Sequence, residues 1–168
     1  QSTKNKEAII SINKAIKLKP NKENLYYTKA SIYMNLNDPL NAISSIKKGL
    51  SINKKNEKGY FQLGNAQIML KKYNLALDSF KKASNLNSKF WQSINNEGLI
   101  LYEMNNLIKA ISKFRLALKI SNNAEPMLAL ASALFSLDKN SKESVILAKN
   151  ALTSNPKYVS KEYQSSQL

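Results

Sequence analysis

Small and large apolar residues recur along the chain at intervals of three, four and seven positions. In residues 74–90, NLALDSFKKASNLNSKF, Ala76 is followed four positions later by Phe80, and Phe80 three positions later by Ala83. Such spacings place side chains on one face of an α-helix, whereas a strand would alternate every second position. The pattern therefore predicts an amphipathic helix whose buried face carries a small, a large and a small side chain.

The same pattern returns every 34 residues. The first small position is held by Ala8, Ala42, Ala76, Ala110 and Ser144. The large position is held by Ile12, Ile46, Phe80, Phe114 and Ala148. The second small position is held by Ala15, Gly49, Ala83, Ala117 and Ala151. A further small series, Ala30, Gly64, Gly98 and Ser132, lies twelve positions before the first. Two helices cross closely only where the contacting side chains are small. Each repeat is therefore expected to be a pair of helices, with Phe80 filling the space beside Gly64.

The repeat predicts two sets of helices. First helices are expected near 23–36, 57–70, 91–104 and 125–137, and second helices near 4–18, 39–52, 73–86, 107–120 and 141–153. Asp38-Pro39 is typical of a helix start, with an N-cap followed by a proline in the first turn, and Glu125-Pro126 is expected to start its helix in the same way.

This pattern resembles the tetratricopeptide repeat, which runs large, Leu-Gly, Tyr, Ala, Phe, Ala, Pro over 34 residues. Residues 57–90 fit it best, with Tyr60, Leu63, Gly64, Ala76, Phe80 and Ala83. Lys29 and Glu97 depart from the pattern in the Leu position, as does Gln67 in the Tyr position. The resemblance implies an all-α fold, a right-handed α-solenoid of antiparallel helix pairs in which each pair stacks on the next.

We expect a single array over residues 1–168. It comprises a half repeat with only a second helix at 1–22, complete repeats at 23–56, 57–90, 91–124 and 125–158, and a capping helix at 159–168. The chain begins with Gln1 rather than Met. We therefore expect a piece of a longer protein with further repeats upstream.

Composition argues against catalysis. The chain contains no Cys and no His, which excludes a Ser-His-Asp triad, a thiolate nucleophile and the usual zinc ligands. Glu97 and Glu103 are six positions apart on one predicted helix and so face different directions. We expect no catalytic residue, no metal, no cofactor and no small-molecule substrate.

The resemblance implies a concave groove lined by the first helices, which holds a peptide or a protein segment. The groove positions are Tyr27, Met34, Phe61, Gln62, Asn65, Gln92, Asn96 and Tyr102. Amides such as Gln62 offer a donor and an acceptor to a peptide backbone, and aromatic rings such as Tyr27 offer apolar anchors. The alternative is that the rings belong partly to the core and that the amides reflect codon bias.

Members of the family that bind chaperone tails grip a terminal carboxylate with cations. The matching positions are Tyr27, Ser31, Gln62, Gln92 and Asn96, none of which is a cation. A carboxylate clamp for Hsp70 or Hsp90 tails is therefore disfavoured.

The net charge is +15, from 26 basic and 11 acidic residues. A basic ridge is predicted at Lys47, Lys81, Arg115 and Lys149. It is interpreted as a solvated face, a surface for acidic proteins or anionic membranes, or a nucleic-acid surface. The single arginine and the lack of a groove-reading motif disfavour the last.

The sequence thus predicts a non-catalytic scaffold or adaptor that binds a protein or peptide partner. Self-association through open solenoid ends and an anion-binding convex surface are the alternatives. The sequence does not identify the partner or choose a compartment; a cytoplasmic location is the default, with periplasmic and membrane-tethered ones left open.

Overall fold

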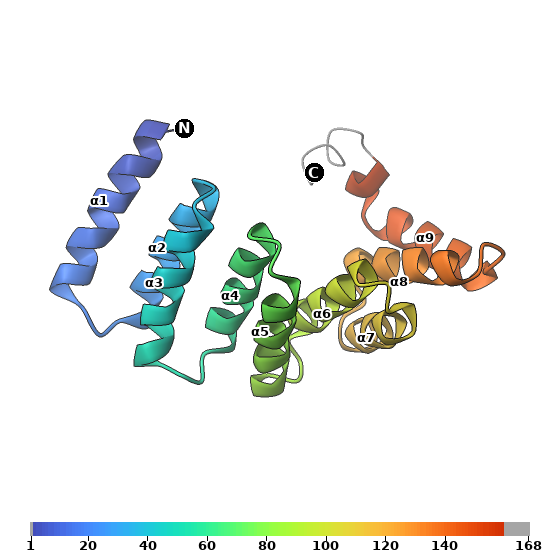
Figure 1. Cartoon of the computed structure of the whole chain (residues 1–168). Helices are drawn as coiled ribbons and strands as arrows, with labels where there is room; N and C mark the ends of the chain where they lie inside the picture. Colours follow the sequence, from blue (N-terminus) through green and yellow to red (C-terminus); the bar gives the residue numbers. More distant parts are fainter. Residues whose placement is uncertain (1, 160–168) are drawn as a thin grey trace. The chain divides into compact units, whose positions relative to one another are not determined.

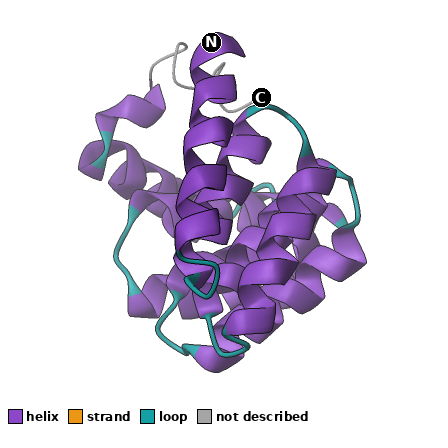
Figure 2. Ribbon diagram, turned by 90° about the vertical axis from the view of Figure 1, so that its left-hand side faces the viewer, coloured by secondary structure: helices purple, strands orange, loops and turns teal. Residues whose placement is uncertain are grey.

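The computed structural model describes residues 2–159, and every regular element in that range is helical (Figure 2). The chain divides into two compact units, Gln1–Ser88 and Lys89–Leu168. None of the described helices combines the length and the apolar character that a membrane crossing needs. The expected all-α fold of paired helices is confirmed.

The first unit is built from two helix pairs preceded by a single helix. Its elements are α1 (Ser2–Leu18), α2 (Glu23–Asn35), α3 (Pro39–Ile52), α4 (Glu57–Met69) and α5 (Tyr73–Leu86). α2 packs antiparallel to α3 and α4 antiparallel to α5, while α3 packs on α4 and α1 on α2 (Figure 1).

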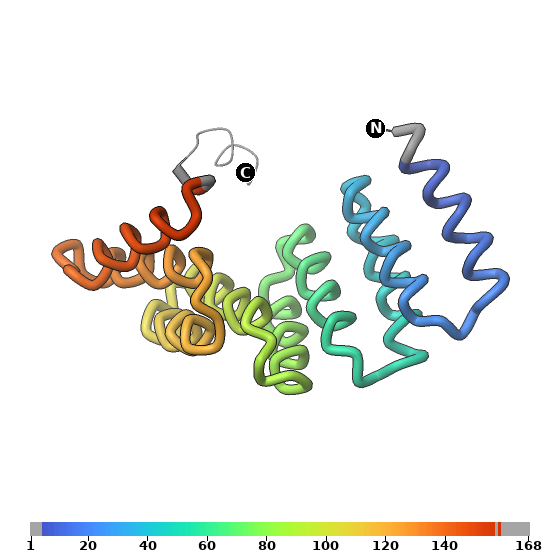
Figure 3. Tube along the Cα trace, turned by 180° about the vertical axis from the view of Figure 1, so that it is seen from behind, coloured from blue at the N-terminus to red at the C-terminus, as the bar shows by residue number. Residues whose placement is uncertain are grey.

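The second unit repeats this arrangement. Its elements are α6 (Trp91–Glu103), α7 (Leu107–Ile120), α8 (Ala124–Leu137), α9 (Lys142–Ser154) and the short 3₁₀ helix η1 (Pro156–Val159). α6 pairs with α7 and α8 with α9, and α7 packs on α8. Figure 3 follows the trace through the short turns that join each pair.

The helices begin and end within two residues of the ranges expected from the sequence. Asp38 caps α3 as predicted, because its Oδ1 accepts a hydrogen bond from the backbone N of Asn41 at 3.1 Å. The start expected at Glu125-Pro126 is wrong: Asn123 is the N-cap, and Pro126 lies within the first turn of α8. A proline is tolerated there because the first N–H groups of a helix have no partner within it. The capping helix expected at 159–168 falls almost entirely outside the described residues.

The predicted contact of small with large side chains forms the core. Ala42, Ala76 and Ala110 are completely buried. A Cβ placed on Gly64 would lie 2.6 Å from Cε1 of Phe80, and the same test on Gly98 gives 2.5 Å to Cε1 of Phe114. Each phenylalanine ring therefore occupies the space that its glycine leaves.

The turn within three of the helix pairs uses one left-handed residue. Asn37, Lys71 and Asn105 have φ angles of 55°, 56° and 58°. They lie 34 residues apart, so the turn is repeated along with the helices. Asparagine tolerates this conformation better than other residues that carry a Cβ.

Candidate functional site

A polar hollow of about 260 Å³ lies between the first helices α2 and α4 of the first unit. It is lined by Asn24, Tyr27, Thr28, Ser31, Asn56, Lys58 and Gln62. The four residues from α2 follow the helical spacing of three, four and seven, so they form one face of that helix. Asn56 is the N-cap of α4, and its Oδ1 accepts a hydrogen bond from the backbone N of Gly59 at 2.8 Å.

Tyr27 lines this hollow, but most of its side chain is buried. Its side chain is 6% exposed and belongs to the core cluster of the first unit. A Cβ on Gly49 would lie 2.6 Å from Cε1 of the ring, and a Cβ on Gly59 would lie 2.6 Å from the hydroxyl oxygen. The two glycines thus leave the space that the Tyr27 ring and hydroxyl occupy.

The Tyr27 hydroxyl is buried and has no hydrogen-bond partner among the described residues. Burial raises its pKa to about 12, and the nearby Glu23 and Tyr60 act in the same direction. Near neutral pH the hydroxyl is therefore protonated and uncharged, and it can both donate and accept a hydrogen bond.

Gln62 lines the same hollow, and one of its two side-chain polar atoms has no hydrogen-bond partner among the described residues. Its Nε2 donates to Oγ of Ser31 at 3.2 Å, and Ser31 Oγ donates to the backbone oxygen of Tyr27 at 3.2 Å. Gln62 Oε1 is buried and has no hydrogen-bond partner in the described part of the chain. Two residues that line the hollow, Tyr27 and Gln62, thus each have a buried polar atom without a hydrogen-bond partner among the described residues.

The other groove residues expected from the sequence do not line this hollow. The ring of Phe61 packs on Phe80 with centroids 5.6 Å apart, and Met34 packs against the core cluster. Asn65 is half-buried on α4. The three that belong to the second unit lie on α6, where Gln92 and Asn96 are half-buried and Tyr102 Oη lies 2.7 Å from Ser136 Oγ. The structure therefore brings together Tyr27 and Gln62 of the eight.

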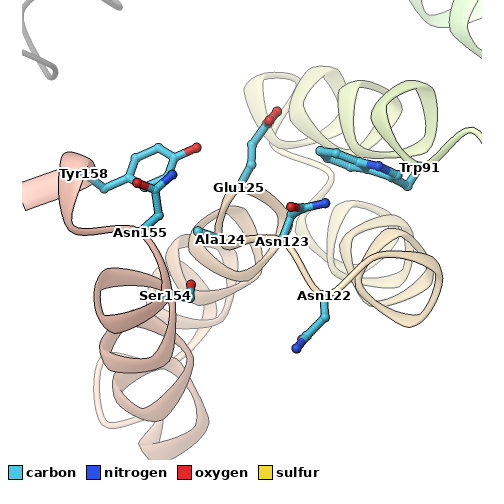
Figure 4. Close-up of a pocket in the computed structure, with 8 residues that line it drawn as sticks. All are labelled: Trp91, Asn122, Asn123, Ala124, Glu125, Ser154, Asn155 and Tyr158. Carbon is cyan, nitrogen blue, oxygen red and sulfur yellow. The ribbon is translucent and has the colours of Figure 1, made fainter.

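Sequence reasoning missed a hollow of about 190 Å³ in the second unit (Figure 4). It is lined by Trp91, Asn122, Asn123, Ala124, Glu125, Ser154, Asn155 and Tyr158. Partial burial raises the pKa of Glu125, and the hydrogen bond from Asn95 Nδ2, at 3.1 Å from Oε1, acts against that rise. These residues come from the ends of separate helices. The single tryptophan, Trp91, was the only feature of the sequence that could have pointed to this hollow.

The basic ridge expected on the second helices is not uniformly charged. In the first unit Lys47 and Lys81 are exposed, and Lys47 lines a hollow of about 460 Å³ together with Tyr26, Lys29, Ser44, Ser45, Lys48 and Ser51. In the second unit Lys149 is exposed, but Arg115 Nη2 lies 2.7 Å from Glu143 Oε2. That pair cancels the charge at one of the four predicted positions.

The acidic residues of the described part do not gather into a metal-binding group. Residues 2–159 hold no cluster of three or more His, Cys, Asp or Glu side chains that could bind a metal ion. Glu97 is completely buried and forms an ion pair with Lys113, so its role is structural.

Comparisons with known proteins agree with the helix-pair architecture. The sequence profile of the tetratricopeptide repeat matches residues 23–56 and 57–90. No curated protein sequence matches the chain. The remaining division of the chain into repeats stays a prediction.

Solved structures share the fold at low sequence identity. MamA aligns with a TM-score of 0.79 and 24% identity, covering 94% of this chain and 92% of its own. YrrB, described as a TPR protein with an unusual peptide-binding site, aligns with a TM-score of 0.71 and 18% identity over 99% of this chain and 86% of its own. The first TPR of Spaghetti (RPAP3), bound to the HSP90 peptide SRMEEVD, aligns with a TM-score of 0.66 and 21% identity over 69% of this chain and 93% of its own.

Residues 23–56 and 57–90 thus match two tetratricopeptide repeats, and the paired helices of the two units have the fold of the tetratricopeptide-repeat structures.

Proposed function

We propose that the chain is a non-catalytic scaffold that binds a segment of a partner protein, with the α2–α4 hollow of the first unit as the contact. The observation that carries this proposal is the hollow itself, which is lined by seven residues with polar side chains. The amides and hydroxyls among them offer hydrogen-bond donors and acceptors to the main chain of a bound segment.

Two structural neighbours support a peptide as the ligand class. YrrB is described as having a peptide-binding site, and the Spaghetti domain was solved with an HSP90 peptide. That peptide, SRMEEVD, is acidic, whereas the positions that would clamp its terminal carboxylate are here the neutral residues Tyr27, Ser31 and Gln62. We therefore expect this chain to bind uncharged segments in preference to acidic tails.

The test begins with a displayed library of random 12-residue peptides selected against the folded chain. The affinities of the selected peptides are then measured by calorimetry for two matched variants. Thr28→Trp fills the α2–α4 hollow, whereas Ser44→Trp places the same side chain at an exposed position of α3 in the lysine-lined hollow. Loss of binding in Thr28→Trp alone supports the proposal, and equal binding by both variants contradicts it.

A second candidate function rests on the lysine-lined hollow. Lys29, Lys47 and Lys48 converge there with three serines, and no acidic residue lines it. Such a surface suits an acidic protein or an anionic membrane. Its binding would weaken steeply as salt is raised, because exposed charges are screened over about 8 Å at physiological salt. Affinity for vesicles containing anionic lipid, measured from 50 to 500 mM salt, separates this function from peptide binding in the α2–α4 hollow.

Self-association through the ends of the array is the remaining proposal. Stacking of that kind is concentration-dependent, so sedimentation at several protein concentrations tests it directly. A mass that stays constant over the concentration range would contradict it.

A further inference from the structure

The lysine-lined hollow of the first unit is formed by α2 and α3, the two helices of one pair. Its α3 side carries residues spaced three and four positions apart, which lie along one stripe of that helix: Ser44, Lys47, Lys48 and Ser51. Lys29 lines the hollow from α2. This hollow shares no residue with the α2–α4 hollow, so the two are separate candidate sites.

Lys29 occupies a position where the repeat does not need a charge. The matching residues 34 and 102 positions later are Leu63 and Ala131. Leu63 packs against the core cluster of the first unit, and Ala131 is buried. Lys29 is half-buried, and none of the described residues forms an ion pair with it. Lysine is seldom buried unless its charge is paired, so this residue calls for an explanation outside the packing of the helices.

An aromatic ring compensates little of the Lys29 charge. Lys29 Nζ lies 5.8 Å from the centroid of the Tyr33 ring. This distance is close to the limit at which a ring attracts a cation. By comparison, Lys82 Nζ lies 4.7 Å from the centroid of the Tyr60 ring in the next repeat. The Lys29 ammonium group therefore remains available to an anion.

The later repeats place a carboxylate at positions where the first complete repeat has none. Asp78 matches Ser44, and Glu97 matches Lys29. Glu97 pairs across its helix pair with Lys113, whose Nζ lies 2.5 Å from Oε2. A pair of helices in this chain thus accommodates a carboxylate beside a lysine at this contact. No acidic residue lines the hollow of the first unit, so its lysines lack a partner of that kind.

We infer that Lys29, together with Lys47 and Lys48, binds the carboxylates of an acidic segment of a partner protein, and that Lys29 determines the specificity of the site. This inference rests on the second candidate function and narrows it to one class of partner. The stripe from Ser44 to Ser51 is about 10 Å long, at 1.5 Å per helical residue. An extended segment covers that length with about three residues, so two or three neighbouring Asp or Glu side chains suit the hollow.

A protein segment fits this hollow better than a bilayer surface does. Lys47 and Lys48 are exposed and would meet a flat anionic surface, whereas Lys29 is half-buried in a recess of about 460 Å³. A protruding Glu or Asp side chain can enter such a recess. Membrane binding therefore assigns no particular role to Lys29, and binding of an acidic segment does. The preference for uncharged segments applies to the α2–α4 hollow alone.

The test uses a peptide with four successive glutamates between flexible Gly-Ser ends, and the same peptide with four glutamines. Calorimetry should detect binding of the glutamate peptide alone. Lys29→Leu, which copies Leu63, is expected to weaken that binding about fivefold, the effect of losing one partly exposed ion pair. Lys29→Arg keeps the charge and should keep the affinity. Lys81→Leu is the matched control, because it removes the same charge from an exposed position of α5 and should leave the affinity unchanged. Equal affinity in Lys29→Leu and the wild type overturns the inference.

A second measurement separates a binding role of Lys29 from a role in the fold. Lys29→Leu removes a half-buried charge and restores the residue of the next repeat. Its melting temperature should therefore equal or exceed that of the wild type, as is common where a binding residue is replaced by one that packs better. A lower melting temperature would mean that Lys29 stabilises the fold and would overturn the inference.

Two further results separate this inference from the proposals on which it borders. If vesicles containing anionic lipid bind and the glutamate peptide does not, the inference fails and the membrane alternative of the second candidate function remains. If neither binds, the second candidate function fails together with the inference. Thr28→Trp, which fills the α2–α4 hollow, should bind the glutamate peptide normally. Loss of binding in that variant would place the peptide in the α2–α4 hollow and overturn the inference.

Discussion

Lys113 Nζ lies 2.5 Å from Glu97 Oε2, and the Glu97 side chain is completely buried. The pair joins α7 to α6 within the second unit and places a carboxylate where the family pattern has an apolar residue. The residues 34 positions earlier are Leu63 and Ser79, which occupy the same two positions without any charge. The chain thus carries a charged pair in one repeat and two uncharged residues at the matching positions of the repeat before it, where Ser79 Oγ bonds instead to Gln67 Oε1 at 2.6 Å.

Removal of one partner of this ion pair should be far more harmful than removal of both. Lys113→Met leaves the buried carboxylate of Glu97 without its cation and is expected to lower the free energy of unfolding by about 3 kcal/mol. The double variant Glu97→Leu/Lys113→Ser copies Leu63 and Ser79 and should be as stable as the wild type or more stable. Urea unfolding followed by the fluorescence of Trp91, the single tryptophan and a residue of α6, measures both. A double variant no more stable than Lys113→Met would contradict this account.

The contact between Gly64 and Phe80 predicts a second pair of variants. Gly64→Ala places a Cβ against the completely buried ring of Phe80. This overpacking is expected to lower the free energy of unfolding by about 1–3 kcal/mol. The higher helix propensity of alanine offsets about 1 kcal/mol of that loss. The repeat before it uses Ala30 and Ile46 at these positions, both completely buried. Gly64→Ala/Phe80→Ile should therefore recover most of the loss. Thermal unfolding followed by circular dichroism measures both variants. A double variant less stable than Gly64→Ala would contradict this account.

The helices and their contacts could be predicted because they depend on local periodicity. The 34-residue spacing of Ala42, Ala76 and Ala110 already determined which face of each second helix is buried, and all three are completely buried. The start of α8 was misplaced because Pro126 is compatible with several positions in a first turn, and only the backbone of Asn123 decides among them.

The candidate site was less predictable, because it depends on single atoms rather than on spacing. Tyr27 was expected as an apolar anchor in the groove, but its side chain belongs to the core cluster of the first unit. The role of Gln62 depends on a hydrogen bond from its amide to Ser31, 31 positions away, which no periodic pattern reports. Arg115 was expected in a basic ridge, and its pairing with Glu143 is likewise a matter of geometry between two helices.

The turn at Lys71 predicts a stabilising substitution. Lys71 has a φ of 56°, and the matching residues in the other two turns are Asn37 and Asn105. A residue with a Cβ is strained in this conformation by roughly 1–2 kcal/mol, and asparagine less so. Lys71→Asn should raise the free energy of unfolding by about 0.5–1 kcal/mol, and Asn37→Lys should lower it by a similar amount. Chemical denaturation of the two variants provides the check, and two changes of the same sign would contradict it.

Glu125 predicts a pH dependence of stability in the second unit. Partial burial raises the pKa of its carboxyl above the ordinary value of 4.5 in the folded chain, with the Asn95 hydrogen bond opposing that rise. Between the unfolded and the folded pKa, the folded chain binds more protons than the unfolded chain does, so this group's contribution to stability falls as pH rises through that window. Above the window the carboxylate is charged and partly desolvated, and its contribution stays unfavourable.

Glu125→Gln keeps an acceptor for Asn95 but cannot ionise. Its stability relative to the wild type should therefore be greater at pH 7 than at pH 4, measured by urea unfolding with Trp91 fluorescence, since Trp91 lines the same hollow. An equal difference at the two pH values would show that the Glu125 carboxyl has the same pKa in the folded and unfolded chains.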